Sequence, residues 1–351
     1  MAITTIDQAL AGMKQPQWIA KAVGGTMVAG RAHSFWQIAG IPPAATVVGT
    51  SIAITTIFSG SAALVLSATH GLNTGDTVSI GGTVSGSPKA DGNYMVTVVS
   101  GSTFTIPLSV SGSGTGGVLS VLSSGVAGSR AAGAPGEVLI GRAGGIPFTD
   151  PTAGQSSYLA RFQASATISG TLLLSDRLWQ NAGINPVVTT YQPFTASGSI
   201  PPRDVNGSSA GTGVYALVEC ASALGNGTPT ITLTYTNSSG STGRTGTNLM
   251  ATANTPTLGD AFTIGLQAGD DGIRRVEGIT LSSTYTSGVI SVVLYVPICA
   301  LELTGAYIPN AVDALTGGFA HIYDDSTLFL LFIPSTTTTS NINGQMIYSQ
   351  G

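Results

Sequence analysis

Apolar and polar side chains alternate along much of the chain, and the pattern is clearest between Ser157 and Trp179. Tyr158, Phe162 and their neighbours recur at a spacing of two, which is typical of a half-buried β-strand. A break at Gly170 precedes a run over 171–174 that has the pattern of a buried strand. We therefore expect 157–179 to form two strands, the first full strand pair of the main domain.

Further strand-like runs follow at short intervals up to the end of the chain. They cover 186–191, 214–220, 230–236, 261–267, 276–281, 289–303, 328–333 and 345–348. The dipeptides Asn226-Gly227 and Ser239-Gly240 are typical hairpin turns. About ten strands in a segment of this length favour two packed antiparallel sheets. The sequence thus predicts a jelly-roll-like β-sandwich over 147–351, with a brief helix near 311–315.

Residues 49–122 have the pattern of a separate small domain. Strand-like runs at 52–58, 63–67, 77–80, 94–100, 103–108 and 118–122 alternate with Gly- and Asn-containing turns. Such a density of short strands predicts a small β-barrel. Residues 123–146 are rich in Gly and Ala, which is typical of a linker. We expect 49–122 to be inserted between an N-terminal segment and the main domain.

Residues 1–48 combine apolar side chains with many Gly and Pro residues. Thr5 and Gln8 stand at the positions of a capping box, which predicts a short helix after Thr5. The segment also carries the large apolar side chains Trp18, Phe35 and Trp36. One interpretation is an extended arm that docks on neighbouring molecules. The other is that the arm packs on its own core, and the sequence leaves both open.

Composition adds an unusual scarcity of charge. Only 8% of the residues are charged, the net charge is −4, and 42% are hydrophobic. A surface with so few charges is poorly protected against association, which favours an oligomer. The scattered Lys and Arg residues argue against nucleic-acid binding. The most apolar run, 289–301, has 13 residues and contains Pro297, too short for a membrane span, and no signal peptide is evident.

Candidate chemistry is sparse. His33, His70 and His321 lie in different segments, without neighbours at metal-ligand spacing. The Gly-rich run 112–117 precedes a strand rather than a helix, so it lacks the context of a dinucleotide site. Cys220 and Cys299 lie in strand-like runs, where buried free thiols are the default and a disulfide stays open. We therefore predict no catalytic, cofactor or metal site and no enzyme.

The densest charge cluster is 270–277, DDGIRRVE. It could bind a divalent cation or form an inter-subunit salt bridge, but a polar hairpin is favoured because the spacing of a calcium loop is absent. Paired carboxylates of a β-sandwich enzyme acting on polysaccharide would meet only in the fold, so that class stays open.

The sequence Asp176-Arg177-Leu178-Trp179 ends a leucine-rich strand with an acid–base pair. We interpret this pair as a buried or interface ion pair that fixes strand register, and the alternative is a strand end that emerges into solvent. The candidate assembly contacts are therefore Trp18, Phe35, Trp36, Asp176, Arg177 and Trp179.

Several segments outside 49–146 are distinctive, among them IDQALAGM, SFWQIAGIP, YLARFQASATISGTLLLSDRLWQNAGI, PPRDVNG, LQAGDDGIRRVEGITL and HIYDDSTLFLLFIPS. They resemble a family of tailed-bacteriophage virion structural proteins that are associated with the head. THGLNTGDTVSIGG, within 49–122, resembles a small β-barrel module common in phage structural proteins.

This resemblance implies a virion protein assembled in the host bacterial cytoplasm. We therefore expect a capsid decoration or cement role, in which the sandwich domains associate as a homotrimer, with the major capsid protein as a further partner and with no cofactor. The alternative is a tail or fibre protein that binds a host surface glycan through the inserted module.

Overall fold

The protein is almost entirely β-structure, as predicted, with 50% strand and 4% helix. The computed structural model describes residues 3, 5–14, 16–23, 25–36, 38, 40–41, 47–72, 74, 76–87, 90, 92–122, 137–139, 145–146, 148, 155–194, 200–252, 255–318, 320–323 and 326–351. Most of the expected linker lies outside these residues. The all-β prediction, with packed antiparallel sheets and an inserted β-module, is confirmed.

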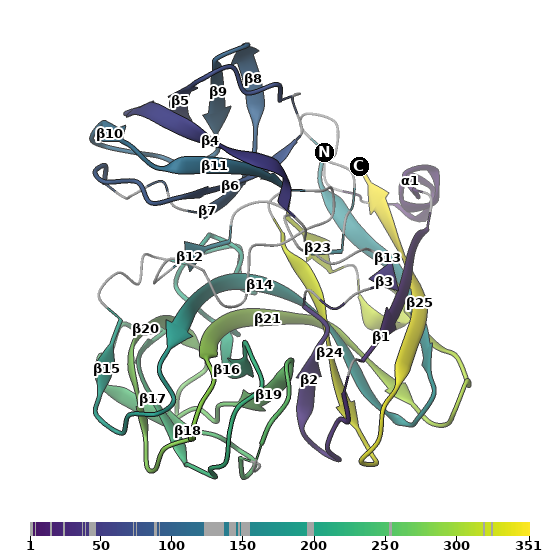
Figure 1. Ribbon diagram of the computed structural model, residues 1–351. Coiled ribbons are helices and arrows are strands. Elements are labelled where there is room, and N and C mark those ends of the chain that lie inside the picture. Colours follow the sequence, from purple (N-terminus) through teal and green to yellow (C-terminus); the bar gives the residue numbers. More distant parts are fainter. Residues whose placement is uncertain are drawn as a thin grey trace.

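A closed ring of six antiparallel strands forms the centre of the main body (Figure 1). In ring order the strands are β14 (Gly170–Ile184), β21 (Ile290–Leu303), β16 (Tyr215–Cys220), β19 (Asp260–Thr263), β2 (Ala32–Ser34) and β24 (Leu328–Pro334). Pairing of β24 with β14 closes the ring, and β12 (Glu137–Val138) adds to β14. Closure leaves the six strands without a free edge, which removes a site of non-specific pairing.

The first flanking sheet contains both the first and the last strand of the chain, and we call it the terminal sheet. Its order is β22 (Asn310–Asp313), β13 (Ser157–Ala166), β25 (Asn341–Gln350), β1 (Gln17–Ala22) and β3 (Gly40–Ile41), and β23 (His321–Ile322) also pairs with β13. Its inner face packs on the ring through one apolar cluster that includes Phe162, Met346, Leu174 and Phe332.

Two short helices border the terminal sheet, α1 (Ile6–Ala11) and α2 (Ala314–Gly317). Thr5 caps α1, because its hydroxyl accepts a hydrogen bond from the backbone amide of Gln8, as predicted. The helix lies beside the C-terminal end of β25 (Figure 1). A Cβ on Gly12 would lie 2.2 Å from the carbonyl oxygen of Gln350, so this close approach requires glycine.

A second flanking sheet packs on another side of the ring, and we call it the small sheet. It consists of β15 (Gln192–Pro193), β20 (Ile273–Leu281), β17 (Ile231–Asn237) and β18 (Arg244–Thr247). Its apolar face, including Leu233 and Ile279, shares a buried cluster with Val218 and Val292 of the ring. The ring is thus covered by two sheets that do not pair with it.

The inserted module has its own core. Its strands are β4 (Val47–Phe58), β5 (Ala63–Ser67), β6 (Thr77–Gly81), β7 (Gly92–Met95), β8 (Thr97–Ser100), β9 (Thr103–Ile106), β10 (Gly114–Thr115) and β11 (Val118–Leu122). In sheet order, β7, β6 and β11 lie on one side of the long strand β4, and β5, β9 and β8 lie on the other. The two outermost strands, β7 and β8, follow each other in the chain and are separated only by Val96, so the two ends of the sheet are linked covalently. Its buried cluster contains only module side chains among the described residues.

Several sequence-based expectations about pairing were wrong. β13 and β14 do not pair with each other, since β13 lies in the terminal sheet and β14 in the ring. The break at Gly170 is confirmed, and it lets the chain cross between layers. Asn226-Gly227 joins β16 to β17, which lie in different sheets, whereas Ser239-Gly240 does turn between the paired strands β17 and β18. Residues 186–191 form no strand.

Candidate assembly surface and buried polar networks

Of the six candidate assembly residues, only Trp18 offers its side chain to solvent, with 58% exposure. Phe35, Trp36 and Trp179 are 3%, 1% and 1% exposed. β2 is itself part of the ring, so the segment around Phe35 and Trp36 packs on the chain's own core. The buried side chains are therefore internal contacts and present no surface to a neighbouring subunit.

Asp176 and Arg177 are both buried, but they are not paired with each other, because successive side chains of a strand point to opposite faces. The Asp176 carboxylate lies 3.1 Å from Nε of Arg203. It also accepts hydrogen bonds from the Ser326 hydroxyl at 2.9 Å and the Thr327 amide at 2.8 Å. Asp176 therefore joins β14 to two distant loops, as a register-fixing contact would.

Arg177 lies inside the ring with no exposed surface. Its Nη2 contacts Oε2 of Glu219 at 3.0 Å and donates to Oε1 of Gln180 at 2.7 Å. The guanidinium carbon lies 4.5 Å from the ring centroid of Trp36 and 5.7 Å from that of Phe329. Aromatic faces compensate part of the lost hydration of a buried cation. The network ties β14 to β16 across the barrel interior.

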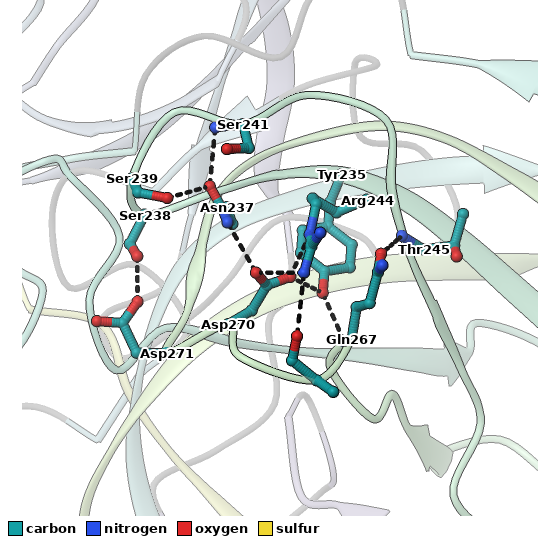
Figure 2. Close-up of polar contacts among 11 residues, drawn as sticks. Tyr235, Asn237, Ser238, Ser239, Ser241, Arg244, Thr245, Gln267, Asp270 and Asp271 are labelled. Carbon is teal, nitrogen blue, oxygen red and sulfur yellow. Dashed lines mark hydrogen bonds and ion pairs between the residues drawn. The ribbon is translucent and has the colours of Figure 1, made fainter.

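Asp270 is the centre of a second network, at the end of the small sheet (Figure 2). Its carboxylate accepts from the Tyr235 hydroxyl and the Asn237 amide at 2.7 Å each. Arg244 approaches it with Nε and Nη2, both at 2.9 Å. Hydrogen bonding by Arg244 lowers the pKa of Asp270 from 3.8 to about 2. The Tyr235 hydroxyl in turn accepts from the backbone amide of Gln267 at 2.8 Å.

The remaining acids of the 270–277 cluster also have protein partners. Asp271 accepts a hydrogen bond from the Ser238 hydroxyl (Figure 2), and Glu277 accepts from the Thr236 hydroxyl at 2.7 Å. In the part of the chain that the structure describes, no three His, Cys, Asp or Glu side chains are grouped so as to hold a metal ion. The expected polar hairpin is wrong, because β19 and β20 lie in different sheets and do not pair. The segment connects two sheets, and its carboxylates fasten loops.

The cysteines and histidines occupy structural positions. Neither Cys220 nor Cys299 forms a disulfide, and burial raises the pKa of the Cys299 thiol to about 12. His33 lies 3.4 Å from Asp260 within the buried core. Nδ1 of His70 accepts from the Leu72 amide at 3.1 Å, while His321 lies at the surface between two tyrosines.

A cavity of about 180 Å³ lies between the Arg203–Val205 loop and β23. Its charged lining consists of Asp176, Arg203 and Asp204. Asp204 accepts hydrogen bonds from four backbone amides and the Ser208 hydroxyl, and these bonds lower its pKa although burial opposes them. The carboxylates are already used within the protein, so the cavity offers little to a ligand.

Exposed apolar side chains gather instead at two borders of the terminal sheet. At the α1 border, Ile6, Leu10 and Met13 are 66%, 57% and 42% exposed. At the β22 border, which includes the segment before β22 and helix α2, Tyr307 and Leu315 are 71% and 82% exposed. The spacing of Ile6 and Leu10 puts them on one face of α1, a signal that was readable from the sequence once the helix was expected.

No protein-family model matches the chain, and no curated protein does either. Among solved structures, the chain aligns with infectious bursal disease virus of the Gx strain at 12% identity, over 96% of this chain and 81% of that one, with a TM-score of 0.14. The VP2 subviral particle of the same virus gives the same identity and coverage, with a TM-score of 0.16. Superpositions this poor carry no argument about fold or function.

No helix among the described residues is both long enough and apolar enough to cross a membrane.

Proposed function

We propose that the chain is a structural protein of a tailed-bacteriophage virion, where it decorates or cements the head by associating with copies of itself and with the capsid. The observation that carries the proposal is the exposed apolar face of α1, formed by Ile6 and Leu10 with Met13 beside it. Exposed apolar groups on a surface with few charges are typical of a protein–protein contact. The virion context comes from the sequence resemblance.

The position of the two apolar borders supports self-association. The α1 border adjoins the end of β25, the middle strand of the terminal sheet, while Tyr307, Ile308 and Leu315 lie around its edge strand β22. Two different apolar surfaces at separate places suit a head-to-tail contact, which closes into a ring when the rotation permits. A trimer is one such ring. The networks around Asp176, Arg177 and Asp270 are internal and take no part in this contact between copies.

Light scattering coupled to size exclusion tests this proposal. The wild-type chain should be oligomeric, and Ile6→Glu combined with Leu10→Glu should yield a folded monomer. Leu249→Glu is the matched control, because Leu249 is 70% exposed but lies in the loop after β18. A monomeric wild type, or an equal effect of Leu249→Glu, would contradict the proposal.

Copy number in the virion tests the head assignment. Quantitative mass spectrometry of purified particles should find hundreds of copies if the chain decorates the head. A handful of copies would favour the tail or fibre alternative and refute the decoration role.

A further inference from the structure

The outer face of the terminal sheet carries an ordered set of uncharged polar side chains. Trp18 pairs with Gln345 and Gln345 pairs with Gln163, so their side chains form one row across three strands. The residues between them along each strand point the other way, into the core. We call the exposed set the amide platform, which consists of Trp18, Gln345 and Gln163 in one row and Ala20, Asn343 and Ser165 in the next.

The platform is open, and its hydrogen-bonding groups are largely unused. Trp18 is 58% exposed, and Asn343 is also exposed. Within the described structure, the side-chain amides of Gln345 and Asn343 make no protein hydrogen bond. Gln163 uses only its amide oxygen, which accepts from Arg161 Nη2 at 2.9 Å. Each amide offers both donors and an acceptor to a ligand.

The chemistry of the platform narrows the class of ligand. No member of the two rows is ionisable. The cation that touches them, Arg161, donates to Gln163 and lies opposite Asp313 on the edge strand β22, so the two opposite charges are neighbours. Nucleic acid requires clustered cations, and a protein partner usually meets a more apolar centre. Neutral sugars fit better, because their hydroxyl groups both donate and accept while their C–H faces pack on an indole ring.

We propose that the amide platform binds an extended, neutral polysaccharide that crosses the strands β1, β25 and β13. Neighbouring strands lie about 4.8 Å apart, which is close to the advance per sugar in an extended β-linked chain. Trp18 stacks on one sugar ring, and the amides of Gln345 and Gln163 bond the hydroxyl groups of the next two. This site differs from the inserted module, to which the sequence-based alternative assigned glycan binding.

The platform proposal does not depend on self-association. α1 covers the far end of β25, where the Ser349 hydroxyl donates to the carbonyl oxygen of Ala9 at 2.5 Å. The platform rows lie four and six residues earlier on that strand, at Gln345 and Asn343. A variant can therefore remove one surface and keep the other.

Affinity electrophoresis of the full chain in native gels tests the site. The gels contain hydroxyethylcellulose, mixed-linkage β-glucan or galactomannan, with carboxymethylcellulose as a β-linked but anionic counterpart. We expect retardation in at least one neutral gel and none in carboxymethylcellulose. Trp18→Ala should weaken retardation at least tenfold and Gln345→Ala several-fold. Tyr191→Ala, the matched control, removes an aromatic side chain that is 48% exposed, lies against Gly278 of the small sheet and belongs to neither proposed surface, so it should change nothing.

Three results would overturn the proposal. One is the absence of retardation in every neutral gel, and another is equal retardation of the Trp18→Ala and Tyr191→Ala variants. The third is a loss of oligomer, measured by light scattering, in Trp18→Ala, which would make the platform an interface between copies. If Trp18→Ala does not fold, normal retardation of Gln345→Ala together with Asn343→Ala refutes the site as well.

Discussion

Asp270→Asn removes one negative charge from the centre of the network at the end of the small sheet. The Asp270 carboxylate is held by Tyr235, Asn237 and Arg244, and its pKa falls from 3.8 to about 2. Each pH unit of such a difference corresponds to about 1.4 kcal/mol, so the ionised carboxylate contributes about 2 kcal/mol to stability. The side-chain amide that replaces the carboxylate would also point an N–H donor at Tyr235, Asn237 or Arg244, which are themselves donors. We expect Asp270→Asn to cost about 2–3 kcal/mol at pH 7.

The contribution of Asp270 to the free energy of unfolding depends on pH in a direction that its lowered pKa determines. A carboxyl group whose pKa is lowered by folding stabilises the protein above its unfolded pKa, and that contribution is lost as pH falls toward the folded value. The difference between wild type and Asp270→Asn should therefore be constant above pH 4 and shrink between pH 4 and pH 2.

Urea unfolding followed by tryptophan fluorescence measures this difference. The three tryptophans, Trp18, Trp36 and Trp179, all lie outside the inserted module, so the signal reports the main body. Asp271→Asn is the matched control, because Asp271 is exposed and adjacent, and should cost less than about 1 kcal/mol. Equal costs for the two variants, or a difference that does not shrink in acid, would refute the reasoning.

Two further predictions concern buried cations. Arg177→Met should destabilise the chain by about 3–5 kcal/mol, because it leaves the Glu219 carboxylate inside the ring without the Arg177 cation. In urea unfolding, Arg177→Met combined with Glu219→Leu should recover most of this loss. Additive losses would contradict the prediction. Lys21 is buried with Nζ 2.8 Å from the carbonyl oxygen of Ile38, and burial lowers its pKa from 10.5 to about 8. Lys21→Met should therefore be more stable than wild type at pH 7, by about 1–2 kcal/mol, and this advantage should shrink as pH rises from 8 to 10.5; an advantage independent of pH would contradict it.

Local pattern was sufficient to find most strands and insufficient to assign their partners. The spacing of two that identified 157–166 depends on one buried face, and both the terminal sheet and the ring provide one. The sequence therefore could not tell that β13 and β14 separate into different layers. Ring closure depends on pairing β2 with β19 and β24, across more than two hundred residues, and no local signal encodes such a contact.

The same difference between local and long-range signals applies to the candidate site. Thr5 and Gln8 identified the helix that carries the exposed apolar face, because capping is a local interaction. Phe35 and Trp36 looked like docking groups because a segment rich in Gly and Pro has no visible core of its own, yet strand β2 completes the ring and buries them. The amide platform went unnoticed because its row across β1, β25 and β13 exists only in the paired register.

The topology also constrains how an assembly could form. Because β1 pairs with β25, the two chain ends lie in one sheet, and Figure 1 places them with α1 and the inserted module toward the same end of the molecule. The small sheet lies toward the other end. A neighbour bound at α1 would therefore sit at the end that carries the module. Insertions are tolerated where they disturb no packed layer, and the module enters between β3, at the edge of the terminal sheet, and β12, at the edge of the ring sheet. The module can therefore vary without altering the ring that holds the α1 border and the amide platform in place.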